Sequence, residues 1–176
     1  MKRPLIKSKR YLFKWVDKEN GRKKPVSSYQ GKERKPLRLT GYNYGSSGAY
    51  YVTVCTHQRQ PLLTQPQLHA IVEKEWLALP QRYPAVTLDT FEIMPDHIHG
   101  LLWIDATVKG APTLFTIMKS YKSITTVAWI RHLKATKPEE KSKLWQRYYH
   151  DQIIRNESHL AAVRQYILNN PKKEQT

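Results

Sequence analysis

Cysteine is almost missing from this 176-residue chain, and long apolar runs are absent altogether. The one cysteine, Cys55, excludes an intramolecular disulfide and a cysteine-rich zinc site, which indicates a reducing compartment. No apolar run approaches the roughly 20 residues that a membrane-spanning helix needs. No apolar stretch typical of a secretory signal follows the first charged residues either. We therefore expect a soluble protein that does not enter a membrane.

Acidic residues are scarce, which leaves a large positive excess near the N-terminus. The chain has 30 lysines and arginines against 14 aspartates and glutamates, a net charge of +16. Residues 1–38 account for +11 of that charge and also contain Tyr11, Phe13 and Trp15. Such a segment favours a nucleic-acid partner, although a solvated arm that only keeps the protein soluble explains the same charges. We expect residues 1–38 to be a poorly ordered basic extension and residues 39–176 to form one domain.

Within that domain, the apolar patterning predicts alternating strands and helices. Strands are expected at 49–56, 86–94 and 97–104, with a further edge strand inside 145–155. Helices are expected at 68–79, ended by Pro80, at about 112–134, and at 157–169, ended before Pro171. The inward side chains of the middle helix are predicted to be Leu114, Ile117, Met118, Tyr121, Ile124, Val127, Ala128 and Ile130. The order β-α-β-β-α-β-α predicts an α+β fold, a ferredoxin-like antiparallel sheet flanked by helices.

Two histidines begin the third predicted strand. His97 and His99 are two residues apart, so on a strand their imidazoles lie on the same face. Two imidazoles on one face supply half of a divalent-metal site. Taken alone, the pair is a weak signal, and an ordinary half-exposed strand explains it more simply.

The last predicted helix carries a phenol and an amide one turn apart. Tyr166 and Asn170 lie on one face of the helix, at the flank of its apolar stripe of Leu160, Val163 and Ile167. They would therefore line the seam between helix and sheet. By itself this spacing favours a packing role for Tyr166 and a helix-ending role for Asn170.

Five sequence blocks, taken together in their order along the chain, give a more specific signal than either pair alone. They are Arg38–Tyr44, Gly48–Thr56, Met94–Gly100, Trp145–Glu157 and Tyr166–Pro171. Together they resemble the REP-associated tyrosine transposases, a branch of the single-tyrosine HUH transposases, which process single-stranded DNA. The resemblance covers most of the chain outside the basic extension, which it leaves unmatched.

The resemblance implies the HUH endonuclease fold and a metal-dependent nicking and joining reaction on DNA hairpins. His97 and His99 match the histidines that bind Mg²⁺ or Mn²⁺, and Asn170 occupies the place of a third, amide-type ligand. Tyr166 matches the nucleophile, whose attack leaves a 5′-phosphotyrosine and a free 3′-hydroxyl. Mixed nitrogen and oxygen ligands favour stronger activity with Mn²⁺. The resemblance further implies a bacterial, cytoplasmic, nucleoid-associated protein that acts as a monomer.

Four basic residues of the domain are candidates for phosphate contacts, although a solvated face explains each of them equally well. They are Lys119, Lys122, Arg147 and Arg155. Nearby aromatic residues, Trp145, Tyr148 and Tyr149, serve either base stacking or core packing. Two other functions stay open: a non-catalytic hairpin-binding module derived from a transposase, and a nuclease that uses water. Covalent attachment to DNA through Tyr166 would separate them from the transposase.

Overall fold

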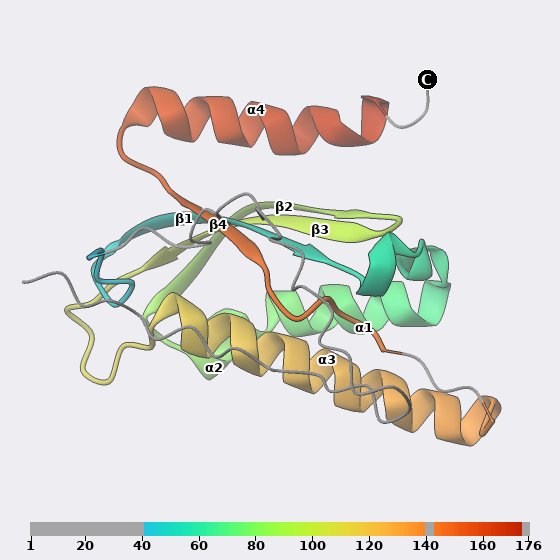
Figure 1. Cartoon of the computed structure of the whole chain (residues 1–176). Coiled ribbons are helices and arrows are strands. Elements are labelled where there is room, and N and C mark those ends of the chain that lie inside the picture. The colour runs from blue at the N-terminus through green and yellow to red at the C-terminus, as the bar shows by residue number, and fades with distance from the viewer. Residues whose placement is uncertain (1–40, 140–142, 174–176) are drawn as a thin grey trace, which may run out of the picture. The chain divides into compact units, whose positions relative to one another are not determined.

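A four-stranded antiparallel sheet organises the chain, with helices on both of its faces (Figure 1). The computed structural model describes residues 41–139 and 143–173, so the basic extension lies outside the described residues. In sheet order the strands are β2 (Val86–Met94), β3 (His97–Ile104), β1 (Gly48–Cys55) and β4 (His150–Ile153). The predicted α+β class and all four predicted strands are therefore confirmed. Within the described ranges no helix is long and apolar enough to cross a membrane.

The helices divide unequally between the two faces of the sheet. α1 (Pro66–Leu77), α2 (Leu79–Arg82) and α3 (Leu114–Thr136) cover the lower face in Figure 1, and α4 (Glu157–Lys173) covers the upper one. Tyr50 and Val52 of β1 pack in the larger hydrophobic cluster, with residues of α1 and α3. The alternate residues Ala49 and Tyr51 pack in the smaller cluster, with residues of α4. Both central strands are consequently buried on their two faces, which explains their almost continuous apolar sequences.

The β2–β3 hairpin turns through Pro95 and Asp96, as predicted, and delivers His97 to the start of β3. Three residues further on, Gly100 lies directly against the Trp76 ring of α1. A Cβ atom at position 100 would be 2.3 Å from Cζ2 of Trp76. The indole therefore occupies the space that any other side chain at this position would need.

The first predicted helix is split in the structure. α1 ends at Leu77, and Pro80 stands in the first turn of α2 rather than at the end of one longer helix. A proline fits the first turn of a helix because its missing N–H would have no helical partner there. Pro80 therefore lies in the first turn of the second helix. The sequence pattern had predicted that it ends the first helix.

α3 has the predicted extent, but its buried face differs from the predicted one in its second half. Val127 and Ile130 are exposed, whereas Thr125, Trp129 and Leu133 are buried. Trp129 is the largest of these side chains, and its burial turns the neighbouring β-branched residues outward. The buried hydroxyl of Thr125 donates a hydrogen bond to the carbonyl of Tyr121 at 2.9 Å. Burial of this polar residue therefore leaves its hydroxyl with a hydrogen-bond partner.

α4 begins as predicted and continues further than predicted. The Asn156 side chain caps it by accepting a hydrogen bond from the His159 amide at 2.8 Å. Leu160, Val163 and Ile167 form the buried stripe. The helix does not end before Pro171 but runs through it to Lys173. The proline removes a single backbone hydrogen bond, and the remaining residues continue the helical path.

Candidate active site

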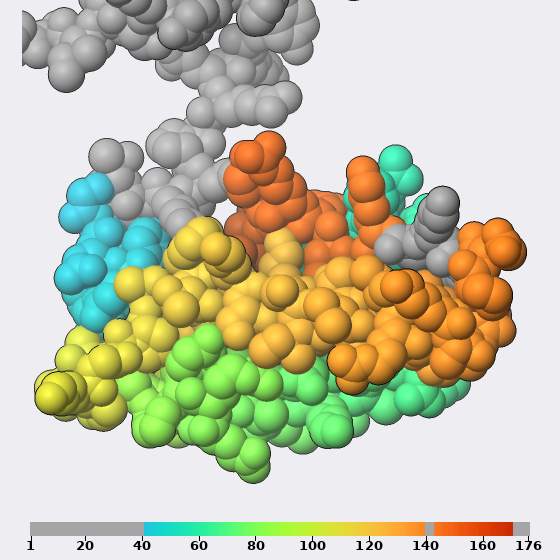
Figure 2. Space-filling view, turned by 90° about the horizontal axis from the view of Figure 1, so that it is seen from below, coloured from blue at the N-terminus to red at the C-terminus, as the bar shows by residue number. Residues whose placement is uncertain are grey.

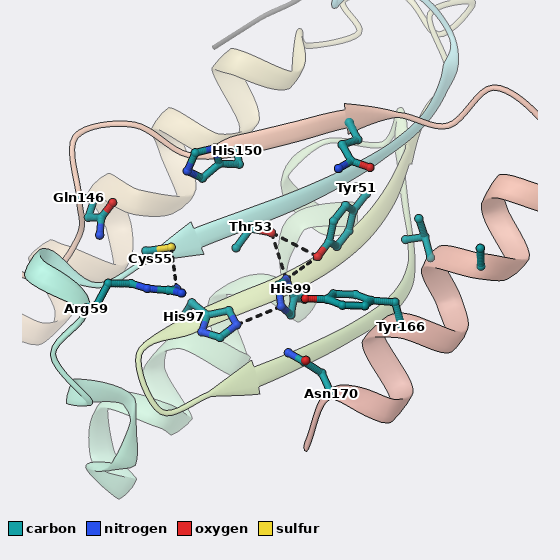
Figure 3. Close-up of a pocket in the computed structure, with 13 residues that line it drawn as sticks. Tyr51, Thr53, Cys55, Arg59, His97, His99, Gln146, His150, Tyr166 and Asn170 are labelled. Carbon is teal, nitrogen blue, oxygen red and sulfur yellow. Dashed lines mark hydrogen bonds between the residues drawn. The ribbon is translucent and has the colours of Figure 1, made fainter. Parts of the chain in front are cut away.

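A cleft of about 790 Å³ lies beside α4 on the face of the sheet that this helix covers (Figure 3). Its walls come from β1, β3, β4 and α4 and from two connecting segments. The lining side chains include Tyr51, Thr53, His97, His99, Tyr166 and Asn170. Four residues selected from the sequence for chemistry, namely the two histidines, the tyrosine and the asparagine, thus meet in one cavity.

The histidine pair lies on the floor of the cleft. His97 and His99 are 6% and 4% exposed, and their Nε2 atoms are 3.0 Å apart. The alternation of β3 directs both rings to the same face, while Ile98 between them enters the opposite cluster. The two nitrogens that the rings do not use elsewhere therefore point to one place.

Each imidazole is held through its other nitrogen. Nδ1 of His99 is 2.7 Å from the Tyr51 hydroxyl and 3.0 Å from Oγ1 of Thr53, the residue opposite it on β1. Nδ1 of His97 lies 2.5 Å from Oδ1 of Asp96 in the hairpin turn. Partners of this kind fix the orientation of a metal-binding histidine and raise the basicity of its free nitrogen.

Burial keeps the second histidine uncharged. It lowers the pKa of His99 to about 4, and the neighbouring His97 and Arg59 act in the same direction while Asp96 opposes them. His99 is therefore neutral at pH 7, which is the form that binds a metal. Burial also raises the pKa of the Tyr51 phenol to about 12, so this hydroxyl keeps its proton beside His99.

The residues present fit a divalent metal ion. The Nε2 atoms of His97 and His99, 3.0 Å apart, are close enough for both to bind one divalent ion. Within the described ranges no cluster of three histidine, cysteine or acidic side chains could hold a metal. A third protein ligand would therefore be an amide such as Asn170, which lines the same cleft.

Tyr166 projects from α4 toward the histidine pair (Figure 3). Its ring centroid is 5.3 Å from that of His99 and 6.2 Å from that of Tyr51. The residue is 46% exposed, so its phenol borders both the cleft and solvent. A side chain in this position is accessible to a ligand that enters the cleft.

An ion pair between a half-exposed arginine and a largely buried aspartate helps to fix the helix that carries Tyr166. Arg164 donates two hydrogen bonds to Asp89 of β2, from Nε to Oδ1 at 3.0 Å and from Nη2 to Oδ2 at 2.6 Å. The indole of Trp103 also donates to Asp89, at 3.1 Å. These contacts, the Arg164 bonds foremost, hold the pKa of the Asp89 carboxyl well below its usual range. The pair therefore ties α4 to the edge strand of the sheet.

We predict that Arg164→Met loosens α4. The variant leaves Asp89, whose side chain is 13% exposed, without its bidentate partner, while the guanidinium itself is 42% exposed and partly screened by water. We expect the free energy of unfolding to fall and the melting temperature to drop by a few degrees. Amide hydrogen exchange in α4 should quicken. Arg155→Met, at an exposed arginine before α4, serves as the control, and equal behaviour of both variants would contradict the prediction.

Arg59 reaches the cleft although no sequence pattern selected it. It follows β1 in a short turn where Gln58 and Arg59 both have positive φ angles, 55° and 58°. This left-handed conformation costs about 1–2 kcal/mol for most residues, so the surrounding structure must hold it in place. A positive φ has no sequence signature at a glutamine or an arginine, which is why the residue was missed.

The four predicted phosphate-binding residues lie outside the cleft lining. Lys119, Arg147 and Arg155 are exposed, whereas Nζ of Lys122 donates to the backbone carbonyls of Gln146 and Arg147, at 2.7 and 3.0 Å. Lys122 therefore anchors the segment that brings Gln146 to the cleft. Of the three nearby aromatic residues, Trp145 and Tyr149 are buried in the core and Tyr148 is 58% exposed.

The chain resembles known proteins in sequence and in fold. Residues 46–170 match the sequence profile of a family described as "Transposase IS200 like". An uncharacterised protein of Haemophilus influenzae is 32% identical, over 78% of this chain and 88% of its own length. The solved structure of a REP-associated tyrosine transposase bound to a REP hairpin superposes with a TM-score of 0.60 at 20% identity, covering 78% of this chain and 74% of the other. This last likeness establishes a shared fold.

Proposed function

Because the chain belongs to the family of IS200-like transposases, we propose that it is a metal-dependent endonuclease and strand transferase for single-stranded DNA hairpins. The observation that carries the proposal is the meeting, in one cleft, of two converging imidazole nitrogens and the phenol of Tyr166. Hairpin DNA is proposed because the structurally similar transposase is bound to a REP hairpin. The net charge of +16 also suits an anionic polymer.

In the proposed reaction Tyr166 is the nucleophile. Its phenol gives up a proton, its oxygen bonds to a backbone phosphorus, and the bond from phosphorus to the 3′ oxygen breaks. The 3′ oxygen takes up a proton and leaves as a hydroxyl, while the 5′ phosphate stays on the tyrosine. The bond energy is kept in the phosphotyrosine link, so a 3′-hydroxyl from another end can displace the tyrosine without ATP. A water nucleophile would cut the strand without this second step.

His97, His99 and Asn170 would hold the metal ion. Mg²⁺ or Mn²⁺ supplies Lewis-acid compensation for the negative charge on the phosphate oxygens when it is bound. Asp96, Tyr51 and Thr53 support the site by orienting the two imidazoles. The mixture of imidazole and amide ligands favours Mn²⁺ over Mg²⁺.

We further propose that the protein acts as a monomer. Tyr166 and the histidine pair come from the same chain and lie within one cleft, so a second copy is not needed to complete the site. Lys119, Arg147 and Arg155 are exposed and remain candidates for contacts to the hairpin phosphates. Lys122 is the weakest of the four candidates, because its ammonium group already serves two carbonyls.

The test uses purified full-length protein and labelled single-stranded hairpins copied from the DNA that flanks its gene. We expect a covalent protein–DNA product in Mn²⁺ and none in EDTA. The released fragment should end in a 3′-hydroxyl that a terminal transferase can extend. Denaturing gels resolve both products.

Two other results would replace the proposal. Tight hairpin binding with no covalent product, across several flanking sequences, would identify a binding module. Metal-dependent cleavage with no covalent product at any time point would identify a nuclease that uses water.

A further inference from the structure

Arg59 is the one lysine or arginine among the described residues that line the cleft. A DNA strand in this cleft would bring a negative charge with each phosphate, and arginine recognises phosphate through several N–H donors at once. The nucleophile and the metal ligands proposed above do not include this residue. Its role can be inferred from how the chain holds it.

The turn that carries Arg59 is held tightly in an unfavourable conformation. Gln58 and Arg59 are consecutive residues with positive φ, and neither is glycine. Thr56, fully buried, donates from its hydroxyl to the Gln60 carbonyl at 2.6 Å and from its amide to the Asp96 carbonyl at 2.9 Å. The turn is thus fastened to the β2–β3 hairpin. Strain that the surroundings hold in this way concentrates at functional sites.

Two contacts orient the guanidinium of Arg59 and leave some of its N–H donors without a described partner. Its Nε lies 3.2 Å from Oδ2 of Asp96, and its Nη1 donates to Sγ of Cys55 at 3.2 Å. The other oxygen of Asp96 holds His97. These contacts use two of the five N–H donors of an arginine, so among the described contacts three donors remain. The side chain is 53% exposed, which leaves them accessible from the cleft.

Arg59 and Tyr166 lie on opposite sides of the histidine pair. Figure 3 shows Arg59 beside His97 and Tyr166 beside His99. In an in-line displacement the nucleophile enters on one side of the phosphorus and the 3′ oxygen departs on the other. A phosphate over the histidines would therefore have Tyr166 on its entering side and Arg59 toward its departing side.

We propose that Arg59 is the phosphate-binding residue of the cleft, with its guanidinium donating hydrogen bonds to one phosphate of the strand that crosses the histidine pair. The proposal rests on the proposed function, because it takes a DNA strand as the ligand. It predicts that the cleft recognises a single, defined phosphate charge. The alternative is that Arg59 only supports Asp96 and, through it, His97.

The experiment measures binding without chemistry. Full-length protein carrying Tyr166→Phe is titrated in EDTA with single-stranded hairpins in which one phosphate at a time is replaced by an uncharged methylphosphonate. We expect one position at which this replacement weakens binding by about 10- to 100-fold. Adding Arg59→Ala should weaken binding of the unmodified strand by a similar factor and remove the penalty at that position. The slope of log K against log salt should fall by about 1.

Controls separate this role from a purely structural one. Arg131→Ala, at an exposed arginine of α3 that does not line the cleft, should keep the full methylphosphonate penalty. Gln58→Gly relieves backbone strain next to Arg59 without removing the guanidinium, and it should keep the penalty too. If Arg59→Ala unfolds in a melting experiment, Arg59→Gln gives the same comparison with a longer side chain in place.

The proposal is overturned if the Arg59 variant keeps the wild-type penalty at every position, because the guanidinium then touches no phosphate. It is also overturned if no position shows a penalty in the parent protein. Neither result depends on covalent chemistry. A failure of the cleavage assay with an intact Arg59-dependent penalty would overturn the enzymatic function and leave the phosphate site standing.

Discussion

Tyr166→Phe is expected to reduce the covalent protein–DNA product by at least about 10³-fold, because loss of a nucleophile removes the step that the rest of the site serves. Hairpin binding should change by less than about twofold, since the ring remains and only a hydroxyl at a half-exposed position is lost. The free energy of unfolding should stay within about 0.5 kcal/mol of the wild-type value. The measurement is a time course of covalent product in Mn²⁺, with binding followed separately by fluorescence anisotropy.

The cleft contains a second tyrosine, Tyr51, so the Tyr166→Phe experiment distinguishes between two candidate nucleophiles. Tyr51 lies 2.7 Å from Nδ1 of His99 and is 8% exposed, and burial raises its pKa to about 12. It is therefore engaged in holding a histidine and reluctant to ionise, whereas Tyr166 is 46% exposed. Tyr148→Phe, at an exposed tyrosine outside the cleft lining, is the matched control and should leave the yield unchanged. A covalent product that persists in Tyr166→Phe would transfer the nucleophile's role elsewhere, with Tyr51 the nearest candidate.

Much of the scaffold follows from local patterns in the sequence. The β-branched and aromatic run of β1 and the two-residue turn before His97 specify strands and a hairpin with little help from tertiary contacts. The spacing of His97 and His99, and of Tyr166 and Asn170, fixes which face of a strand or helix each pair shares. That these two faces meet in one cleft depends on α4 docking across the sheet, which local periodicity does not determine.

Other features depend on tertiary contacts that no local pattern encodes. The buried face of α3 changes near Trp129, because burying this large indole removes more apolar surface from water than burying Val127 or Ile130 would. Thr53 becomes a partner of His99 through the register of β1 against β3, and that register is unknown until the strands are paired. Arg59 depends on two positive φ angles, which a neighbouring hairpin stabilises. Of these features, Thr53 and Arg59 belong to the site, and sequence reasoning missed both.

Replacing His99 by alanine is expected to remove most of the metal-dependent cleavage. The imidazole supplies one of two nitrogens that are 3.0 Å apart, and a single remaining histidine with an amide is a weak site for Mg²⁺ or Mn²⁺. Metal assistance at a phosphate contributes several kcal/mol, so we expect a loss of about 10²–10⁴-fold in cleavage rate. Mn²⁺ binding, followed by electron paramagnetic resonance or calorimetry, should weaken in parallel. His97→Ala should behave in the same way.

His150→Ala is the matched control for this experiment. His150 lies on β4 and lines the same cleft, but its side chain is exposed and it is not part of the converging pair. Its removal should leave Mn²⁺ affinity within about twofold of wild type, a difference of about 0.4 kcal/mol. Equal losses of Mn²⁺ binding in the His99 and His150 variants would mean that the ion is held by the cleft as a whole. If cleavage survives in both His97→Ala and His99→Ala, the two histidines do not bind the ion that cleavage needs. Their role is then structural, because their rings order the floor of the cleft only through contacts with Asp96, Tyr51 and Thr53.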